Sequence, residues 1–252
     1  MTHVETAIEK GSVERNAAAA QIRRIREIER TKSEPAYITD REAAYYIGGL
    51  GGLNATLAHL KCIGRPTIVG LGEGTTRGIF ELSRTEQARG LNFHATVLSM
   101  PTQVDRYLGR ARTHMTSAEG LSLPGIEPGT VGAFLGSNSI AYSAAPELVA
   151  YQMDRYLAPG GVIKACFARH NATGDELAFN QRTGFQTADR MEAILEGEPF
   201  NYDVVTYDDG ISTTLLAVKP GIYPKGFAEE LFVEDWNTAP SEEELRKDSR
   251  YR

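Results

Sequence analysis

Residues 66–78 read Pro-Thr-Ile-Val-Gly-Leu-Gly-Glu-Gly-Thr-Thr-Arg-Gly, an apolar run that ends in glycines and continues into helix-forming sequence. This pattern predicts a strand, a tight turn and the start of a helix. Glycines at such a junction let the backbone approach a ligand closely, and the N-terminus of the following helix offers unpaired N–H groups. The stretch therefore predicts a binding site for a nucleotide-like ligand.

Apolar runs alternate with helical patterns from Pro66 to Pro220, which is typical of an α/β protein with a parallel sheet and crossover helices. The predicted strands are residues 67–71, 92–98, 131–136 and 161–167, and the predicted helices are residues 77–89, 103–110 and 146–157. Two further strand-like runs, residues 202–207 and 212–219, are joined through Asp208-Asp209-Gly210. An antiparallel hairpin is therefore expected to close the sheet.

The chain on either side of this region has a different character. Residues 13–32 interleave alanines and isoleucines with arginines, which predicts an amphipathic helix, and residues 54–61 predict a further short helix. Residues 223–252 are rich in charge and read as a surface arm or tail. We therefore expect an N-terminal helical extension over residues 1–60, an α/β domain over residues 61–220, and a C-terminal arm or tail over residues 221–252.

Charge and cysteine content narrow the class of protein. The 252-residue chain has a formal net charge of −6, which gives no general attraction to nucleic acid or to anionic membranes. Cys62 and Cys166 are too few for a disulfide framework or a cysteine-built metal site, which favours a reducing compartment. With no signal-peptide pattern and no apolar run long enough to span a bilayer, we expect a cytoplasmic protein without membrane or nucleic-acid partners.

Three segments in a fixed order carry a family resemblance: the Gly72-Glu73-Gly74 turn, residues 116–124 (Thr-Ser-Ala-Glu-Gly-Leu-Ser-Leu-Pro), and residues 157–162 (Leu-Ala-Pro-Gly-Gly-Val). Together they resemble the class I S-adenosylmethionine-dependent methyltransferases, over about Leu50 to Pro220. The resemblance implies a Rossmann-like methyltransferase fold whose mostly parallel sheet ends in an antiparallel pair. It also implies S-adenosylmethionine as the cofactor and methyl transfer to a small-molecule acceptor as the activity.

The same resemblance implies where the cofactor would lie. It assigns the glycine turn, the end of the second strand, the adenine-side segment and the end of the fourth strand to the cofactor site. These positions are Gly70, Leu71, Gly72, Glu73, Gly74, Ser99, Met100, Ser117, Ala118, Glu119, Gly136 and Ser137.

Several positions depart from the family pattern, because carboxylates are missing where the family usually has them. Gly70, Ser99, Ser117 and Gly132 stand at these positions, and Thr76 replaces the third glycine of the turn. A charge-assisted hydrogen bond exceeds a neutral one by about 1 kcal/mol. Losing two or three would weaken cofactor binding by about one to two orders of magnitude. Glu73 and Glu119 can supply substitute carboxylates, each slightly displaced from the usual position.

The acceptor would approach the segment that follows the fourth strand. Some family members carry an Asn-Pro-Pro-aromatic motif there, which Asn138 and Tyr142 resemble faintly because both prolines are absent. A polar loop at the pocket mouth is the alternative interpretation. Asn138 and Tyr142 are our candidates for orienting the acceptor, and His114 is the candidate general base if the acceptor must lose a proton. A packing histidine is the other interpretation of His114, and no ligand spacing indicates a metal site.

Other functions remain open at this point, including a protein that binds the cofactor but cleaves it or senses it. A non-catalytic methyltransferase-like binding or scaffold protein would explain the missing carboxylates. An NAD(P)-dependent oxidoreductase would use the spacing of Gly72, Gly74 and Gly78, but it would place an acidic residue near Ser99. The isoleucines of residues 13–32 can pack on the main domain or on a second subunit, so a homo-oligomer through the N-terminal helices is a further expectation.

Overall fold

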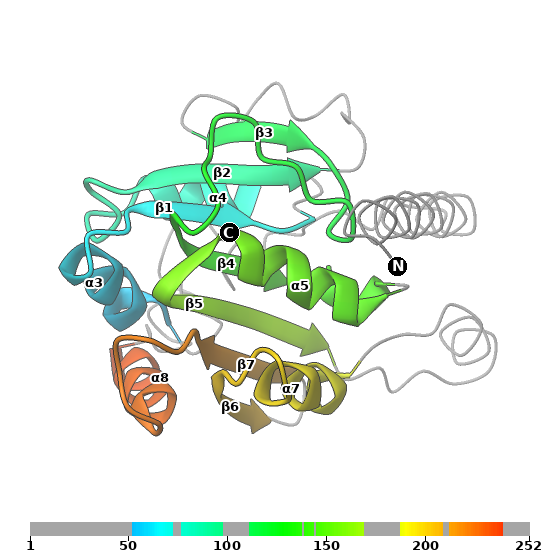
Figure 1. The fold of residues 1–252 in the computed structure, drawn as a ribbon. Coiled ribbons are helices and arrows are strands. Elements are labelled where there is room, and N and C mark those ends of the chain that lie inside the picture. The colour runs from blue at the N-terminus through cyan, green and yellow to red at the C-terminus, as the bar shows by residue number, and fades with distance from the viewer. Residues whose placement is uncertain are drawn as a thin grey trace.

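The fold is built around one mixed β-sheet with helices on both faces (Figure 1). The computed structural model describes residues 52–72, 77–97, 111–137, 139–143, 145–168, 187–208 and 212–238. Its strands are β1 (Thr67–Gly70), β2 (Asn92–Val97), β3 (Ala111–Met115), β4 (Val131–Ser137), β5 (Leu157–Ala168), β6 (Asp203–Asp208) and β7 (Ser212–Val218). They lie in the order β3-β2-β1-β4-β5-β7-β6, and only the pairings made by β7 are antiparallel.

The described helices divide between the two faces of the sheet. They are α3 (Asn54–Cys62), α4 (Arg77–Ser83), the short 3-10 helix η2 (Ile140–Tyr142), α5 (Pro146–Tyr156), α7 (Ala188–Glu196) and α8 (Phe227–Thr238). Successive residues of a strand point to opposite faces. Accordingly, Ile68 packs with α3, α4 and α8, whereas the next residue, Val69, packs with α5 and α7.

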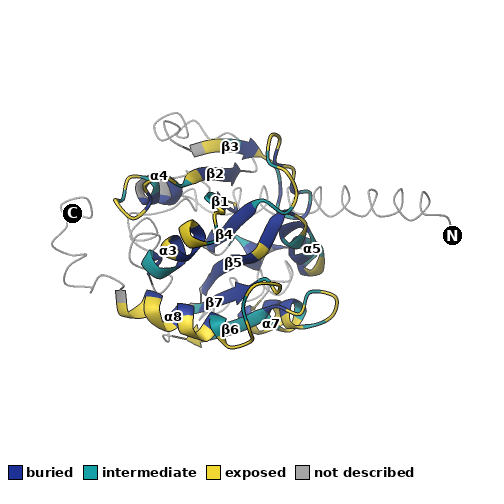
Figure 2. Ribbon diagram, turned by 60° about the vertical axis from the view of Figure 1, so that its left-hand side comes forward, coloured by how far each residue is buried: buried dark blue, intermediate teal, exposed yellow. Residues whose placement is uncertain are grey.

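Burial on both faces explains why the central strands are apolar along their whole length. Figure 2 shows the central strands buried between helices whose outer surfaces are exposed. In β4, Ala133, Phe134 and Leu135 are each at most 1% exposed, although they alternate between the two cores. Parallel strands covered on both faces read as continuous apolar runs, and for that reason their positions could be predicted from the sequence.

The predicted strands and hairpin are confirmed, with small changes at their ends. β5 begins at Leu157 and so includes the Pro159-Gly160-Gly161 turn, and helix α4 ends at Ser83 rather than at Arg89. Strand β3 was not expected from the sequence, because Arg112 and His114 interrupt its apolar pattern. The predicted helices 13–32 and 103–110 lie outside the described residues.

The region assigned to a C-terminal arm or tail contains α8, and this helix packs against the sheet and against α3. Ala228, Leu231 and Phe232 are buried at helical spacing, although acidic residues surround them in the sequence. The Asp203 carboxylate accepts the N–H groups of Gly226 and Ala228, so it caps the start of α8. Residues 227–238 are thus part of the packed domain, which corrects the expectation of an arm for this stretch.

Helix α3 crosses the predicted boundary between residues 60 and 61, and it too is packed on the sheet. The carbonyl of Gly160 lies 2.8 Å from Nε2 of His59, whose ring also contacts Tyr223 and Phe227. Among the described residues, none of the helices has the length and apolar character that crossing a membrane requires.

Candidate functional site

The glycine turn after β1 lies where three strands of the sheet end. The N–H of Leu71 donates to the carbonyl of Leu135 in β4 (2.7 Å), and the N–H of Gly72 donates to Oγ1 of Thr96 in β2 (2.9 Å). The strand order reverses its direction at β1, which has β2 on one side and β4 on the other. In open α/β sheets, ligands bind at the carboxyl ends of the strands at such a switch point.

Gly72 is required here both for its backbone conformation and for its size. Its φ is +64°, a region that side chains with a Cβ rarely adopt, and an added Cβ would lie 2.6 Å from the Cβ of Ser139. The turn is thereby packed between the end of β2 and the segment that follows β4. Because Gly72 has no side chain, the backbone of the turn can approach a ligand closely.

Ser139 provides the clearest polar group at this junction. Its hydroxyl is buried and has no hydrogen-bond partner among the described residues. A Cβ on Gly136 would lie 3.2 Å from this hydroxyl, so Gly136 and Ser139 are close neighbours. A buried hydroxyl without a partner is costly unless another group satisfies it, which fits a bound ligand at the switch point.

The predicted adenine-side segment forms a compact turn directly beside the end of β2. The N–H of Thr116 donates to the carbonyl of Val97 (3.0 Å), and the Oγ1 of Thr116 donates to the carbonyl of Gly120 (2.8 Å). The Oγ of Ser117 accepts the N–H of Gly120 (3.0 Å), while Ala118 is half-buried. Segment 116–120 therefore lies next to the strand end that the resemblance assigns to the cofactor.

Glu119 faces the segment after β4. Its side chain is fully buried, and its Oε1 accepts the hydroxyl of Ser143 at 2.9 Å. The same Ser143 oxygen accepts the N–H of Ala145, which immediately precedes α5. The carboxylate thus joins the segment after β3 to the segment after β4, a contact that the sequence did not predict.

His114 is paired with a second histidine on the neighbouring strand. His94 Nδ1 lies 2.9 Å from His114 Nε2, and both side chains are buried. Burial is the main cause that lowers the pKa of His94 to about 4, and His114 and Arg112 lower it further. Burial and then Arg112 also lower the pKa of His114. The Nε2 atom of His114 is therefore engaged with His94, and His114 packs in a histidine pair at the β2–β3 edge of the sheet.

The remaining predicted site residues can be placed only in part. Gly70 ends β1, Ser137 ends β4 and Tyr142 ends η2. Gly132 is the second residue of β4, so it lies at the opposite end of that strand from the site and is not one of its positions. The positions outside the described residues are Glu73, Gly74, Ser99, Met100 and Asn138.

Three contributors to the site were missed from the sequence: Thr96, Ser139 and Ser143. Thr96 lies near the carboxyl end of a predicted strand and Ser139 just after another, which is the signal that could have identified these two, whereas Ser143 lies beyond η2 and gives no such signal. Within the described ranges, no group of three potential metal ligands comes together.

No family model and no curated protein matches this chain, but solved structures do. One is phosphoethanolamine N-methyltransferase 2 of Haemonchus contortus with S-adenosyl-L-methionine, at 15% identity and a TM-score of 0.55. The match covers 79% of this chain and 60% of that one, which is less than two thirds of the relative's length. Another is the plantazolicin methyltransferase BpumL with SAH, at 13% identity and a TM-score of 0.55, covering 85% of this chain and 99% of that one.

These likenesses define the class of fold. The chain has the Rossmann-like fold of class I S-adenosylmethionine-dependent methyltransferases, with the antiparallel strand that the sequence resemblance implied. The low identities agree with the altered motifs at the glycine turn and at the strand ends.

Proposed function

We propose that this protein binds S-adenosylmethionine at the Gly72 turn and transfers its methyl group to a small-molecule acceptor. The observation that carries the proposal is the position of Gly72, at the switch point of a methyltransferase-type sheet and without space for a side chain. Two solved structures with this fold contain S-adenosyl-L-methionine or SAH, which supports the proposal.

The sheet topology favours this proposal over a nicotinamide-dependent oxidoreductase. The classic dinucleotide-binding sheet is parallel and has the strand order 3-2-1-4-5-6. Here the antiparallel β7 lies between β5 and β6. The extra antiparallel strand is the feature that the methyltransferase resemblance implied, and it has no place in the dinucleotide pattern.

The described residues fit the cofactor through neutral groups. The backbone at Gly72, the buried hydroxyl of Ser139 and the turn at Ser117 and Ala118 would hold it. S-adenosylmethionine would supply an electrophilic methyl group on a good leaving group. The protein therefore needs mainly to align the acceptor and exclude water, and no triad is required. Because the nearby carboxylate of Glu119 is engaged with Ser143, we expect the weaker cofactor binding that the missing carboxylates predict.

The fold alone does not determine which molecule accepts the methyl group. One neighbour is named for phosphoethanolamine and another for plantazolicin, two different molecules on one architecture. A small-molecule acceptor and a cytoplasmic location are parts of this proposal that rest on the sequence.

Calorimetric titration with S-adenosylmethionine and S-adenosylhomocysteine tests the proposal, with NAD⁺ as a control ligand. We expect micromolar binding of both adenosyl ligands and none of NAD⁺. In Gly72→Ala the new Cβ would push Ser139 away, and we expect a loss of at least about tenfold in affinity, or about 1.4 kcal/mol.

Gly64→Ala is the matched control, because Gly64 has a φ of +65° but no heavy atom within 4 Å of an added Cβ. It carries the same backbone strain as Gly72→Ala without the contact at the site, so its affinity should equal that of the wild type. If the folded, monodisperse wild type binds neither adenosyl ligand, the non-catalytic scaffold replaces our proposal. Binding of NAD⁺ alone would favour the oxidoreductase.

A further inference from the structure

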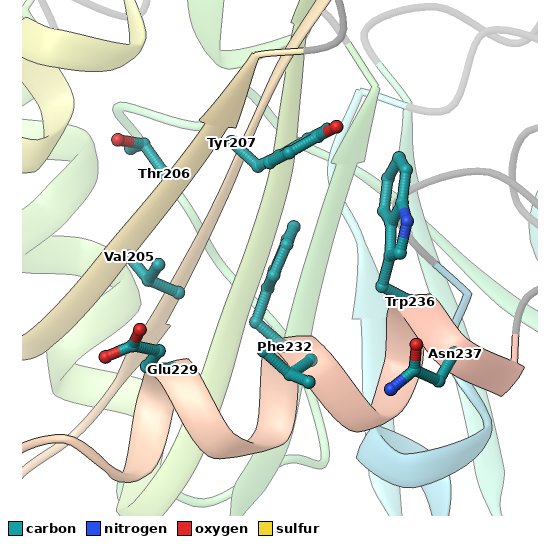
Figure 3. A pocket seen from close by; sticks show the side chains of 8 residues that line it. Val205, Thr206, Tyr207, Glu229, Phe232, Trp236 and Asn237 are labelled. Atoms are coloured by element: carbon teal, nitrogen blue, oxygen red, sulfur yellow. The ribbon is translucent and has the colours of Figure 1, made fainter.

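An exposed apolar groove lies between the edge strand β6 and helix α8 (Figure 3). We call it the α8 groove, and its lining residues are Val205, Thr206, Tyr207, Glu229, Phe232, Val233, Trp236 and Asn237. The side chains of Tyr207 and Trp236 are each 42% exposed, and the centroids of their rings lie 4.6 Å apart. Large apolar side chains gathered on a surface in this way mark interaction sites.

The groove is bordered by negative charge. Helix α8 carries Glu229, Glu230 and Glu234 on its exposed surface and contains no Lys or Arg. Glu230 and Glu234 are four residues apart and therefore lie on one side of the helix, beside Val233. A ligand for this groove must combine apolar side chains with positive charge.

Residues 13–32 of the same chain have this combination. They contain six Arg and Lys residues and only three Glu. As a helix, they would present Ile22, Ile25 and Ile28 as an apolar stripe. Arg23, Arg26 and Arg30 would lie along one side of that stripe, at spacings of three and four residues. Glu27 also lies in this row, which therefore keeps a net positive charge that complements the exposed glutamates of α8.

The chain also leaves the described domain close to this helix. The Lys164 ammonium donates to the carbonyl of Gly52 and lies 2.7 Å from Oδ2 of Asp235, the residue before Trp236. Residues 33–51 connect this point to the amphipathic segment, and extended they can span roughly 60 Å. A segment tethered in this way has an effective concentration on the order of millimolar for its neighbouring surface.

We propose that residues 13–32 dock as an amphipathic helix into the α8 groove of their own chain. The isoleucine stripe covers Tyr207 and Trp236, and the arginines face the glutamates of α8. The docking holds the N-terminal segment against the β6 edge of the sheet. It does not depend on cofactor binding, so it can fail or succeed separately from the proposed function.

Trp236 reports directly on this contact, because it is the only tryptophan of the chain. The experiment is acrylamide quenching of its fluorescence in the full-length protein. We expect a protected tryptophan in the wild type, and a severalfold higher quenching constant with a red-shifted emission in Ile25→Asp. Ile8→Asp places the same change outside the stripe and should leave the quenching at the wild-type value.

Charge reversal tests the pairing of the two rows. Arg23→Glu with Arg26→Glu should also expose Trp236, and adding Glu230→Arg with Glu234→Arg should restore its protection. Equal quenching of the wild type and Ile25→Asp would overturn the proposal, since the isoleucine stripe would then not protect Trp236. Protection that is lost on dilution, together with a dimer mass by light scattering, would assign the groove to a second copy and would also overturn it.

Discussion

At the scale of single residues, steric packing can determine which amino acid a position accepts, whatever residue a family motif has there. Gly132 stands where the resemblance led us to look for a carboxylate. A Cβ there would lie 2.0 Å from the carbonyl oxygen of Arg65, and the pairing register of β4 shifts at this residue. No other residue fits without moving the backbone, so the absence of an acidic side chain at Gly132 carries no information about the cofactor.

Glu119 gives a test at the same scale, because its carboxylate is fully buried and accepts the hydroxyl of Ser143. Glu119→Ala removes this acceptor, and we expect the free energy of unfolding to fall by about 1–3 kcal/mol. Glu119→Gln retains an acceptor oxygen and should lose less. Urea unfolding measures both, with Glu127→Ala in the same loop, where the side chain is exposed, as the control. Wild-type stability of Glu119→Ala would show that the link to Ser143 contributes nothing.

At the scale of elements, one buried ion pair joins β5, α3 and α8. Lys164 and Asp235 are fully buried and 2.7 Å apart, and Asp235 also accepts the N–H and the hydroxyl of Thr56 in α3. Burial lowers the pKa of Lys164, and the Asp235 carboxylate opposes that effect. The pair explains how the short helix α3 and the acidic helix α8 are fixed on the same face of the sheet.

Removing one member of this pair should be far more costly than removing both. Asp235→Ala leaves the Lys164 ammonium buried without its carboxylate, and we expect a loss of about 3–5 kcal/mol in the free energy of unfolding. Lys164→Met combined with Asp235→Leu removes both charges and should lose much less. A double-mutant cycle from urea unfolding measures this coupling. If the single and double changes are simply additive, Lys164 and Asp235 are not coupled and the ion pair does not hold the two helices together.

At the scale of the whole molecule, the histidine pair makes stability depend on pH. His94 is protonated near pH 6.5 in the unfolded chain but only near pH 4 in the folded protein. Between these values the unfolded chain binds more protons, so the free energy of unfolding decreases as the pH falls from 6.5 toward 4. One proton contributes at most about 1.4 kcal/mol per pH unit.

His94→Gln keeps a polar side chain beside His114 but removes this titration. We therefore expect a smaller decrease in stability than in the wild type when urea unfolding is repeated at several values between pH 7 and pH 4. The carboxylates are the same in both proteins, so the difference between the two curves isolates the histidine. Parallel curves would mean that the His94–His114 contact does not set the acid sensitivity.

The sequence by itself determined the framework of this protein. Strands buried on both faces appear as uninterrupted apolar runs, and the glycines at residues 70–74 and the amphipathic pattern of residues 146–157 are equally local signals. The order of these elements predicted a mostly parallel sheet, and the resemblance of residues 72–74, 116–124 and 157–162 to class I methyltransferases implied that it is of the methyltransferase type. It also located the turn at Gly72, since backbone conformation depends mainly on the residues at the turn itself.

Only the tertiary structure decided the features that join distant parts of the chain. Polar β3 is a strand because β2 pairs with it, and α8 belongs to the core because its few apolar residues meet the sheet and α3. Glu119 with Ser143, His94 with His114, and Lys164 with Asp235 are separated by 20 to 71 residues. A single polar residue shows no periodic pattern in the sequence, so its partner cannot be predicted from neighbouring residues. The three-dimensional packing therefore determines these pairs and, with them, the detailed chemistry of the site.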